Sequence, residues 1–118
     1  MIRNTAVSAA LAILVGCATV SDQQAIETVS GARASIEQAE RVDAGTRQAD
    51  VMASARDKLD AAQRALDAGD EARSIRLAEE ARADAAYAVA ATRAEQTQAA
   101  VSEIEQTLRT LRSETAVQ

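Results

Sequence analysis

The sequence ALDAGD at residues 65–70 determines how this chain folds back on itself. Gly69 favours the end of a helix, because glycine adopts the left-handed backbone conformation without steric cost. Asp70 follows directly and is a preferred N-cap for a new helix. A helix that ends and a helix that begins with almost no loop between them predict an antiparallel helical hairpin.

The residues before this turn have the periodicity of an amphipathic helix. Apolar side chains recur at alternating intervals of three and four residues, at Met52, Ala55, Leu59, Ala62 and Leu66. This spacing is the a/d pattern of a coiled-coil seam. We expect a helix over residues 47–68, with Gly45 ending the preceding helix and Thr46 or Asp50 starting this one.

The residues after the turn contain no helix breaker, so a helix is predicted over residues 70–113. Such a helix is about 66 Å long at 1.5 Å per residue, about twice the length of its neighbours. The apolar residues of its first half are small: Ala78, Ala81, Ala85 and Ala88. Those of its second half are large and form a predicted C-terminal seam: Val101, Ile104, Leu108 and Leu111.

A further helix is predicted upstream, over residues 22–44. Ser21 and Gln24 have the spacing of a capping box, which marks a helix N-terminus. An apolar face follows at helical intervals, at Ala25, Val29, Ala32, Ile36 and Ala39. Gly31 costs about 1 kcal/mol inside a helix relative to alanine. It is either tolerated there or it lets a neighbouring helix approach closely.

These patterns predict an all-α fold, an antiparallel three-helix bundle with a long C-terminal coiled-coil-like helix. The second helix covers only the first half of the third, so the C-terminal seam is expected to project beyond the turn at Gly45 and to face water. We expect the seam to pack on another copy or on a partner protein. The alternative is that the third helix bends back or frays. Tyr87, the single aromatic residue, is expected to be partly buried and is a further candidate for interaction.

The N-terminus has the order of an export signal: Arg3, an apolar run at residues 6–15, and then LVGC at residues 14–17. Leu14, Val15, Gly16 and Cys17 resemble the bacterial lipobox. The resemblance implies that diacylglycerol is attached to Cys17, that the chain is cut before it, and that the new amino group is acylated, commonly with palmitate. The alternative is an ordinary secretory signal with a chance cysteine. The predicted organisation is a signal peptide at 1–16, a lipidated linker at 17–21 and a helical domain at 22–118.

The composition excludes several classes of function. A net charge of −5 and 1% aromatic residues argue against nucleic-acid binding, which needs basic surface. No histidine is present, and the single cysteine is assigned to lipid, so no metal site or cofactor is expected. Acidic pairs such as Glu37 and Glu40 are typical of a solvated helix face. We therefore expect that the protein is not an enzyme.

Three stretches of the chain carry a recognisable pattern. One contains Leu59, Ala62, Ala65, Leu66, Gly69 and Asp70, a second contains Leu77, Ala78, Ala81, Asp84 and Ala85, and the third is residues 31–39. Together they resemble the domain of unknown function 4398, an alanine-rich helical family of bacterial envelope proteins that is often placed before OmpA-like domains, and residues 31–39 resemble its opening helix. The family supplies no catalytic residues.

The sequence therefore predicts a non-enzymatic outer-membrane lipoprotein that faces the periplasm. Its helical body would act as a structural spacer or protein-interaction adaptor. The expected partners are the membrane, through the lipid on Cys17, and either a second copy or another envelope protein. Two alternatives remain open: a periplasmic module that binds lipid or a small apolar ligand, and a structural lipoprotein associated non-covalently with the cell wall.

Overall fold

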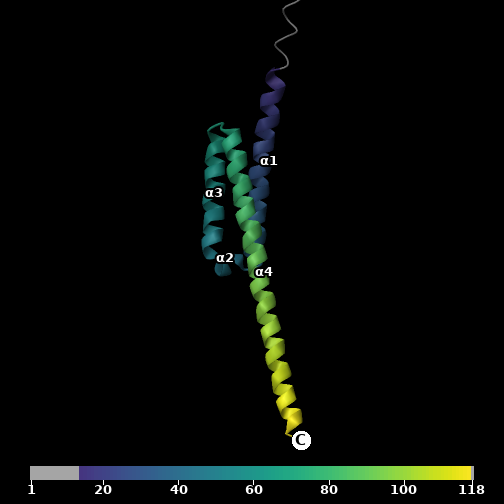
Figure 1. The fold of residues 1–118 in the computed structure, drawn as a ribbon. Helices are drawn as coiled ribbons and strands as arrows, with labels where there is room; N and C mark the ends of the chain where they lie inside the picture. The colour runs from purple at the N-terminus through teal and green to yellow at the C-terminus, as the bar shows by residue number, and fades with distance from the viewer. Residues whose placement is uncertain (1–13, 118) are drawn as a thin grey trace, which may run out of the picture.

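The computed structural model describes the backbone of residues 14–117 and the side chains of residues 21–117. Four helices follow one another: α1 (Leu14–Arg41), α2 (Ala44–Arg47), α3 (Ala49–Asp67) and α4 (Glu71–Ala116) (Figure 1). The described residues contain no strand. The predicted all-α fold with a long C-terminal helix is confirmed.

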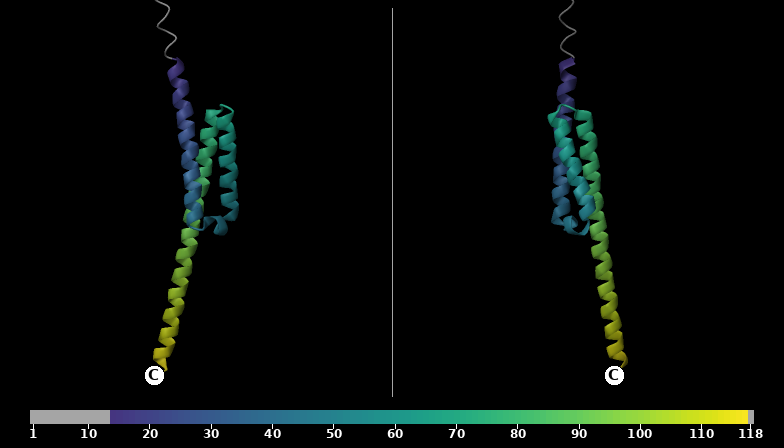
Figure 2. Two further views of the ribbon diagram at one scale, coloured as in Figure 1. Left: turned by 180° about the vertical axis from the view of Figure 1, so that it is seen from behind. Right: turned by 90° about the vertical axis from the view of Figure 1, so that its left-hand side faces the viewer.

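The three long helices form an antiparallel bundle around α4. Helices α1 and α3 each contact α4 more extensively than they contact one another. Helix α4 has 46 residues, a length of about 69 Å, and only its first half lies beside α1 and α3. Its second half continues beyond the bundle as a single helix (Figures 1 and 2).

The turn between α3 and α4 confirms the prediction from residues 65–70. Gly69 has a φ of 74°. Its N–H donates to the carbonyl of Leu66, and the N–H of Asp70 donates to the carbonyl of Ala65, each at 2.9 Å. This pair of hydrogen bonds is a Schellman motif. The side chain of Asp70 then accepts from the N–H of Arg73 at 3.1 Å, which caps α4.

The connection between α1 and α3 differs from the prediction. Helix α1 ends at Arg41 and not at residue 44, and Gly45 lies inside the one-turn helix α2. The residue that reverses the chain is Asp43, with a φ of 67°. Aspartate is one of the few residues apart from glycine that adopt this conformation readily. Ala44 is fully buried directly after it, so α2 closes the end of the core.

The outer bounds of α1 and α4 also differ from the prediction. Helix α1 begins at Leu14 and passes through Ser21, which is therefore not an N-cap, and residues 17–21 are helical. Extending an existing helix costs little once its first turn has formed, and nothing between residues 14 and 22 interrupts it. For the same reason α4 continues to Ala116, beyond the predicted end at residue 113.

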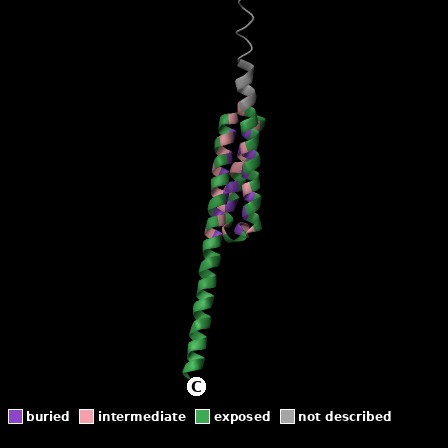
Figure 3. Cartoon of the chain, turned by 90° about the vertical axis from the view of Figure 1, so that its right-hand side faces the viewer, coloured by how far each residue is buried: buried purple, intermediate pink, exposed green. Residues whose placement is uncertain are grey.

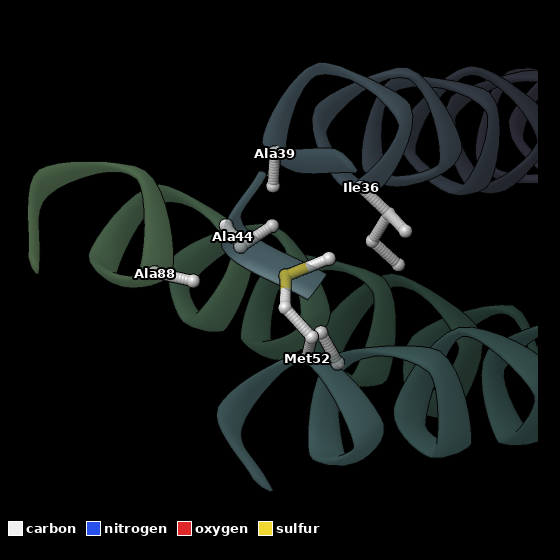
Figure 4. Packing of buried hydrophobic residues seen from close by; sticks show 7 residues of the cluster. Ile36, Ala39, Ala44, Met52 and Ala88 are labelled. Atoms are coloured by element: carbon white, nitrogen blue, oxygen red, sulfur yellow. The ribbon is translucent and has the colours of Figure 1, made fainter. Parts of the chain in front are cut away.

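The core consists almost entirely of alanine. All five predicted core positions of α1 are buried, as are the four predicted alanines of α4 (Figure 3). On α3, Met52, Ala55 and Ala62 are buried, whereas Leu59 and Leu66 are half-buried and pack against the core. Met52 is the largest fully buried side chain among the described residues. Figure 4 shows it between residues of the other three helices.

Two polar residues, Ser74 and Thr92, extend the buried series of α4 at both ends. They lie four residues before Ala78 and four residues after Ala88. Both side chains are fully buried, and neither hydroxyl oxygen has a hydrogen-bond partner. An unsatisfied buried hydroxyl costs about 1–3 kcal/mol, so both residues lower the stability of the bundle.

The Thr92→Val substitution tests this cost. Valine keeps the shape of threonine and removes the unpaired hydroxyl, so we expect the free energy of unfolding to rise by about 1 kcal/mol and Tm by about 4–8 °C. Thr110→Val is the control, because Thr110 is exposed and its hydroxyl donates to the carbonyl of Gln106. A fall in Tm for Thr92→Val would mean that the buried hydroxyl stabilises the fold.

Substitution of Gly31 and of Gly69 by alanine is expected to change the free energy of unfolding in opposite directions. No atom lies within 4 Å of a Cβ added at Gly31, so the glycine is tolerated there and no neighbouring helix requires it. Gly31→Ala should raise the free energy of unfolding by about 1 kcal/mol. Gly69→Ala should lower it by about 1–2 kcal/mol, because alanine is strained at positive φ. Urea denaturation measures both, and shifts of the same sign would contradict this explanation.

Candidate interaction surface

The C-terminal seam is exposed to solvent along its whole length. The exposed fractions are 43% for Val101, 60% for Ile104, 45% for Leu108 and 52% for Leu111. Thr92 is the last buried residue of α4, and residues 93–117 are all exposed (Figure 3). The predicted overhang is confirmed. The alternative, in which the helix bends back or frays, is wrong because α4 continues to Ala116.

Polar contacts with Glu95 mark the point where the bundle ends. Gln48 donates from Nε2 to Glu95 Oε1 at 2.6 Å, and Arg47 Nη1 lies 3.8 Å from Glu95 Oε2. Arg47 is the last residue of α2, and Gln48 connects α2 to α3. Beyond this point neither α1 nor α3 reaches α4, so the seam has no intramolecular surface to cover it.

The seam lies on the outer face of α4. Val101 follows the buried Thr92 by nine residues, which is about 900° of helical rotation and therefore a half-turn in net effect. The core face and the seam are thus on roughly opposite sides of the same helix. A simple extension of α1 or α3 would not bury the seam, and a partner would have to approach from the outside.

Tyr87 lies on the same outer face. Its exposed fraction is 62%, so the expectation of partial burial is wrong. The residue stands beside the buried Ala88, but its side chain projects to the side of α4 that neither α1 nor α3 covers. Fourteen residues separate Tyr87 from Val101, close to four full turns, which places both on one side of the helix.

The best-shielded polar contact joins α3 to α4 at Asp84. Lys58 Nζ lies 2.7 Å from Asp84 Oδ2, and Ser54 Oγ donates to the same oxygen at 2.9 Å. Burial raises the pKa of the Asp84 carboxyl, but the hydrogen bonds from Lys58 and Ser54 and the charge of Lys58 outweigh it. The pKa of Asp84 therefore lies below its usual value. This contact fixes the register of α3 against α4.

A shallow groove runs between α1 and α4 and has a volume of about 470 Å³. Ser35, Gln38 and Arg41 line it from α1, and Ala86, Val89 and Arg93 line it from α4. The groove is open to solvent along its length. No group of three or more potential metal ligands occurs among the described residues. Within the same part of the chain, no helix is both long enough and apolar enough to cross a membrane.

The lipobox prediction falls at the edge of the described structure. Leu14, Val15, Gly16 and Cys17 form the first turn of α1, and their side chains lie outside the described residues. Residues 1–13, the rest of the predicted signal peptide, also lie outside them. Lipidation of Cys17 stays a prediction from the sequence.

The fold can now be compared with known proteins. The family described as Domain of unknown function (DUF4398) matches residues 27–104. The chain belongs to this family. The DUF4398 match includes both turns, nearly the whole core and α4 as far as Ile104. No curated protein and no solved structure matches the chain.

Sequence reasoning identified the seam but missed three other features. Ser74 and Thr92 continue the intervals of three and four residues on α4, so their spacing alone could have placed them in the core. The contact of Lys58 with Asp84 joins residues 26 positions apart. No local pattern indicates it, because it depends on how far α3 and α4 slide past one another.

Asp84→Asn tests the polar contact between α3 and α4. We expect the substitution to lower stability at pH 7 by about 1 kcal/mol, or about 4–8 °C in Tm, as for a charge-assisted bond that keeps some solvent contact. A lowered pKa stabilises the fold above the unfolded carboxyl pKa of about 3.9, and this contribution is lost as the pH falls through the folded value. The difference between the two proteins should therefore vanish in acid.

Asp60→Asn is the matched control, because Asp60 is an exposed aspartate on α3, the helix that packs against Asp84. Thermal unfolding from pH 2 to pH 7 measures both variants. A difference between Asp84→Asn and the natural chain that stays constant over this range would contradict the assigned role of the carboxylate charge.

Proposed function

We propose that this DUF4398 protein is a non-enzymatic lipoprotein of the outer membrane that faces the periplasm. Lipid on Cys17 anchors one end of the molecule, and the helical body acts as a spacer or adaptor. The observation that carries the proposal is the exposed seam on the half of α4 that projects from the bundle. A rigid helix with aliphatic residues on one side is suited to binding another protein.

The direction of the helices supports this arrangement. Helices α1 and α4 run parallel, so the start of α1 and the end of α4 lie at opposite ends of the molecule (Figure 1). At 1.5 Å per residue along α1, back along α3 and down α4, Cys17 and Leu111 are separated by about 70 Å along the axis. A lipid at Cys17 would therefore hold the seam well away from the membrane surface.

Lipid attachment would provide a durable anchor. Each buried methylene contributes about 0.8 kcal/mol, and two or more acyl chains are needed for stable attachment. The lipobox resemblance implies three chains on Cys17. Ala18, in place of aspartate, is the residue that the same resemblance associates with delivery to the outer membrane.

An apolar-ligand module has weaker support. Every alanine of the core apart from Ala65 is fully buried at 0% exposure, so the helices already fill the space that a ligand would need. The groove between α1 and α4 is open, whereas most small-molecule sites enclose the larger part of their ligand. The projecting half of α4 would also have no role in such a module.

Cys17→Ser tests the anchor in the full chain, expressed in a Gram-negative host with an alkyne analogue of palmitate. We expect the natural chain to be labelled and to fractionate with the outer membrane. Cys17→Ser should lose the label and leave that fraction, because serine cannot form the thioether. Thr19→Ser, two residues further along, is the control and should behave as the natural chain does.

Ala18→Asp distinguishes lipid attachment from delivery to the outer membrane. It should keep the palmitate label and move the protein to the inner membrane. Absence of label on the natural chain would overturn the lipoprotein assignment. Label that persists in Cys17→Ser would overturn the assignment of the lipid to Cys17.

A further inference from the structure

An exposed apolar stripe on α4 extends well beyond the C-terminal seam. It begins beside the bundle and follows the outer face of the helix at intervals of three and four residues. Every one of its members is exposed. We call this surface the outer stripe, and it consists of Ala83, Ala86, Ala90, Ala94, Thr97, Val101, Ile104, Leu108, Leu111 and Thr115.

The spacing of the outer stripe is that of a coiled coil. From Ala94 to Thr115 the intervals alternate strictly between three and four residues, a period of 3.5 over three heptads. A straight helix has a period of 3.6, so a sustained 3.5-residue repeat follows a supercoil around a second helix. The surface that fits the outer stripe is therefore another long helix.

We propose that a second copy of this chain covers the outer stripe, with the two α4 helices parallel and in register. This inference deepens the proposed function, because it names the partner of the same exposed surface. The resulting dimer places both copies of α1 on the same end. Two lipid anchors at Cys17 would then enter one membrane together.

The charges beside the stripe are compatible with parallel pairing. In a parallel coiled coil, each g position lies near the e position of the partner five residues later. These pairs contain no two charges of the same sign, and so they add no repulsion. They are Arg93 with Gln98, Ala100 with Glu105, and Thr107 with Arg112.

The outer stripe offers enough area for a specific interface between two copies. The stripe from residue 83 to residue 115 is about 48 Å long and about 10 Å wide. Pairing along it covers on the order of 1,000 Å² in total, about the minimum for a specific interface. An antiparallel pair could match the same length, but it would place the two predicted Cys17 anchors at opposite ends of the dimer, so attachment to one membrane favours the parallel pair.

The bundle leaves room for this partner. Helices α1 and α3 pack on the core face of α4, about a half-turn away from the C-terminal seam, and of the outer stripe Ala86 also lines the groove beside α1. The four alanines at the upper end of the stripe allow two helix axes to approach to about 8 Å. Tyr87 lies at the edge of this alanine section, where its ring would cover the rim of the interface.

Disulfide crosslinking of the full chain in its cellular membrane tests the proposal. Cys17 is kept so that the chain stays at its membrane, and the natural chain is the baseline for any product formed through Cys17 itself. Thr97→Cys, on the stripe, should give a product of twice the chain mass on mild oxidation. Ala99→Cys is the matched control, because it is exposed at the same level on the opposite side of the helix, and its product should be at least tenfold weaker.

A second substitution probes the contact itself. Leu108→Asp added to Thr97→Cys should reduce the dimer product at least tenfold, since it places a charge in the paired stripe. Gln106→Asp, on the opposite face at the same level, should leave the product unchanged. Because both residues lie beyond the bundle, neither change affects the core.

Three outcomes would overturn the proposal. Equal products from Thr97→Cys and Ala99→Cys would mean that the crosslink reports random collision. A product from Leu108→Cys without one from Thr97→Cys would exclude parallel pairing in register and favour an antiparallel pair centred near Leu108. Crosslinks only to a different protein would identify that protein as the occupant. The last result would contradict the dimer but not the proposal of a lipoprotein adaptor. Failure of palmitate labelling would contradict the lipoprotein proposal but not the dimer. The two experiments therefore test the two proposals separately.

Discussion

Alanine packing is the interaction on which the rest of this structure depends. A methyl group stabilises a helix interface only when the two helix axes approach to about 8 Å. Each of the three long helices therefore presents an unbroken alanine-rich face, and each buried alanine of α4 is fully excluded from solvent. Such a core has little tolerance for larger side chains. Met52 is accommodated in the cluster to which Ala44 of α2 also belongs, at the end of the bundle that α2 closes.

Because the core side chains are small, polar contacts and turns determine how the helices are aligned along one another. Burial of small side chains contributes less per residue than burial of leucine or phenylalanine, and methyl groups at similar spacing could slide past one another. The contact of Lys58 with Asp84 fixes α3 against α4. Glu95 holds the α2–α3 connection at the lower end of the bundle. The left-handed residues Asp43 and Gly69 reverse the chain at the two ends.

The projecting half of α4 has two properties that together suit it to binding a partner. It carries aliphatic side chains that water does not favour, and it holds them on a rigid helix beyond the reach of α1 and α3. An isolated helix in water is usually marginal, and the projecting half is stabilised at its upper end by the bundle. A partner helix along the outer stripe would bury these side chains and would support the helix over the rest of its length.

The sequence alone determined the three long helices, the turn at Gly69 and the core faces, because each depends on residues close together in the chain. It also determined that the C-terminal seam lies beyond the end of the second helix, because the third helix is predicted to be about twice as long as the second. Asp43 as the reversing residue and the exposure of Tyr87 required the tertiary structure. So did the pairing of Lys58 with Asp84 and the position of the seam opposite the core. These features depend on which side of each helix meets its neighbour, and in a core of nearly identical alanines only the packed arrangement decides that.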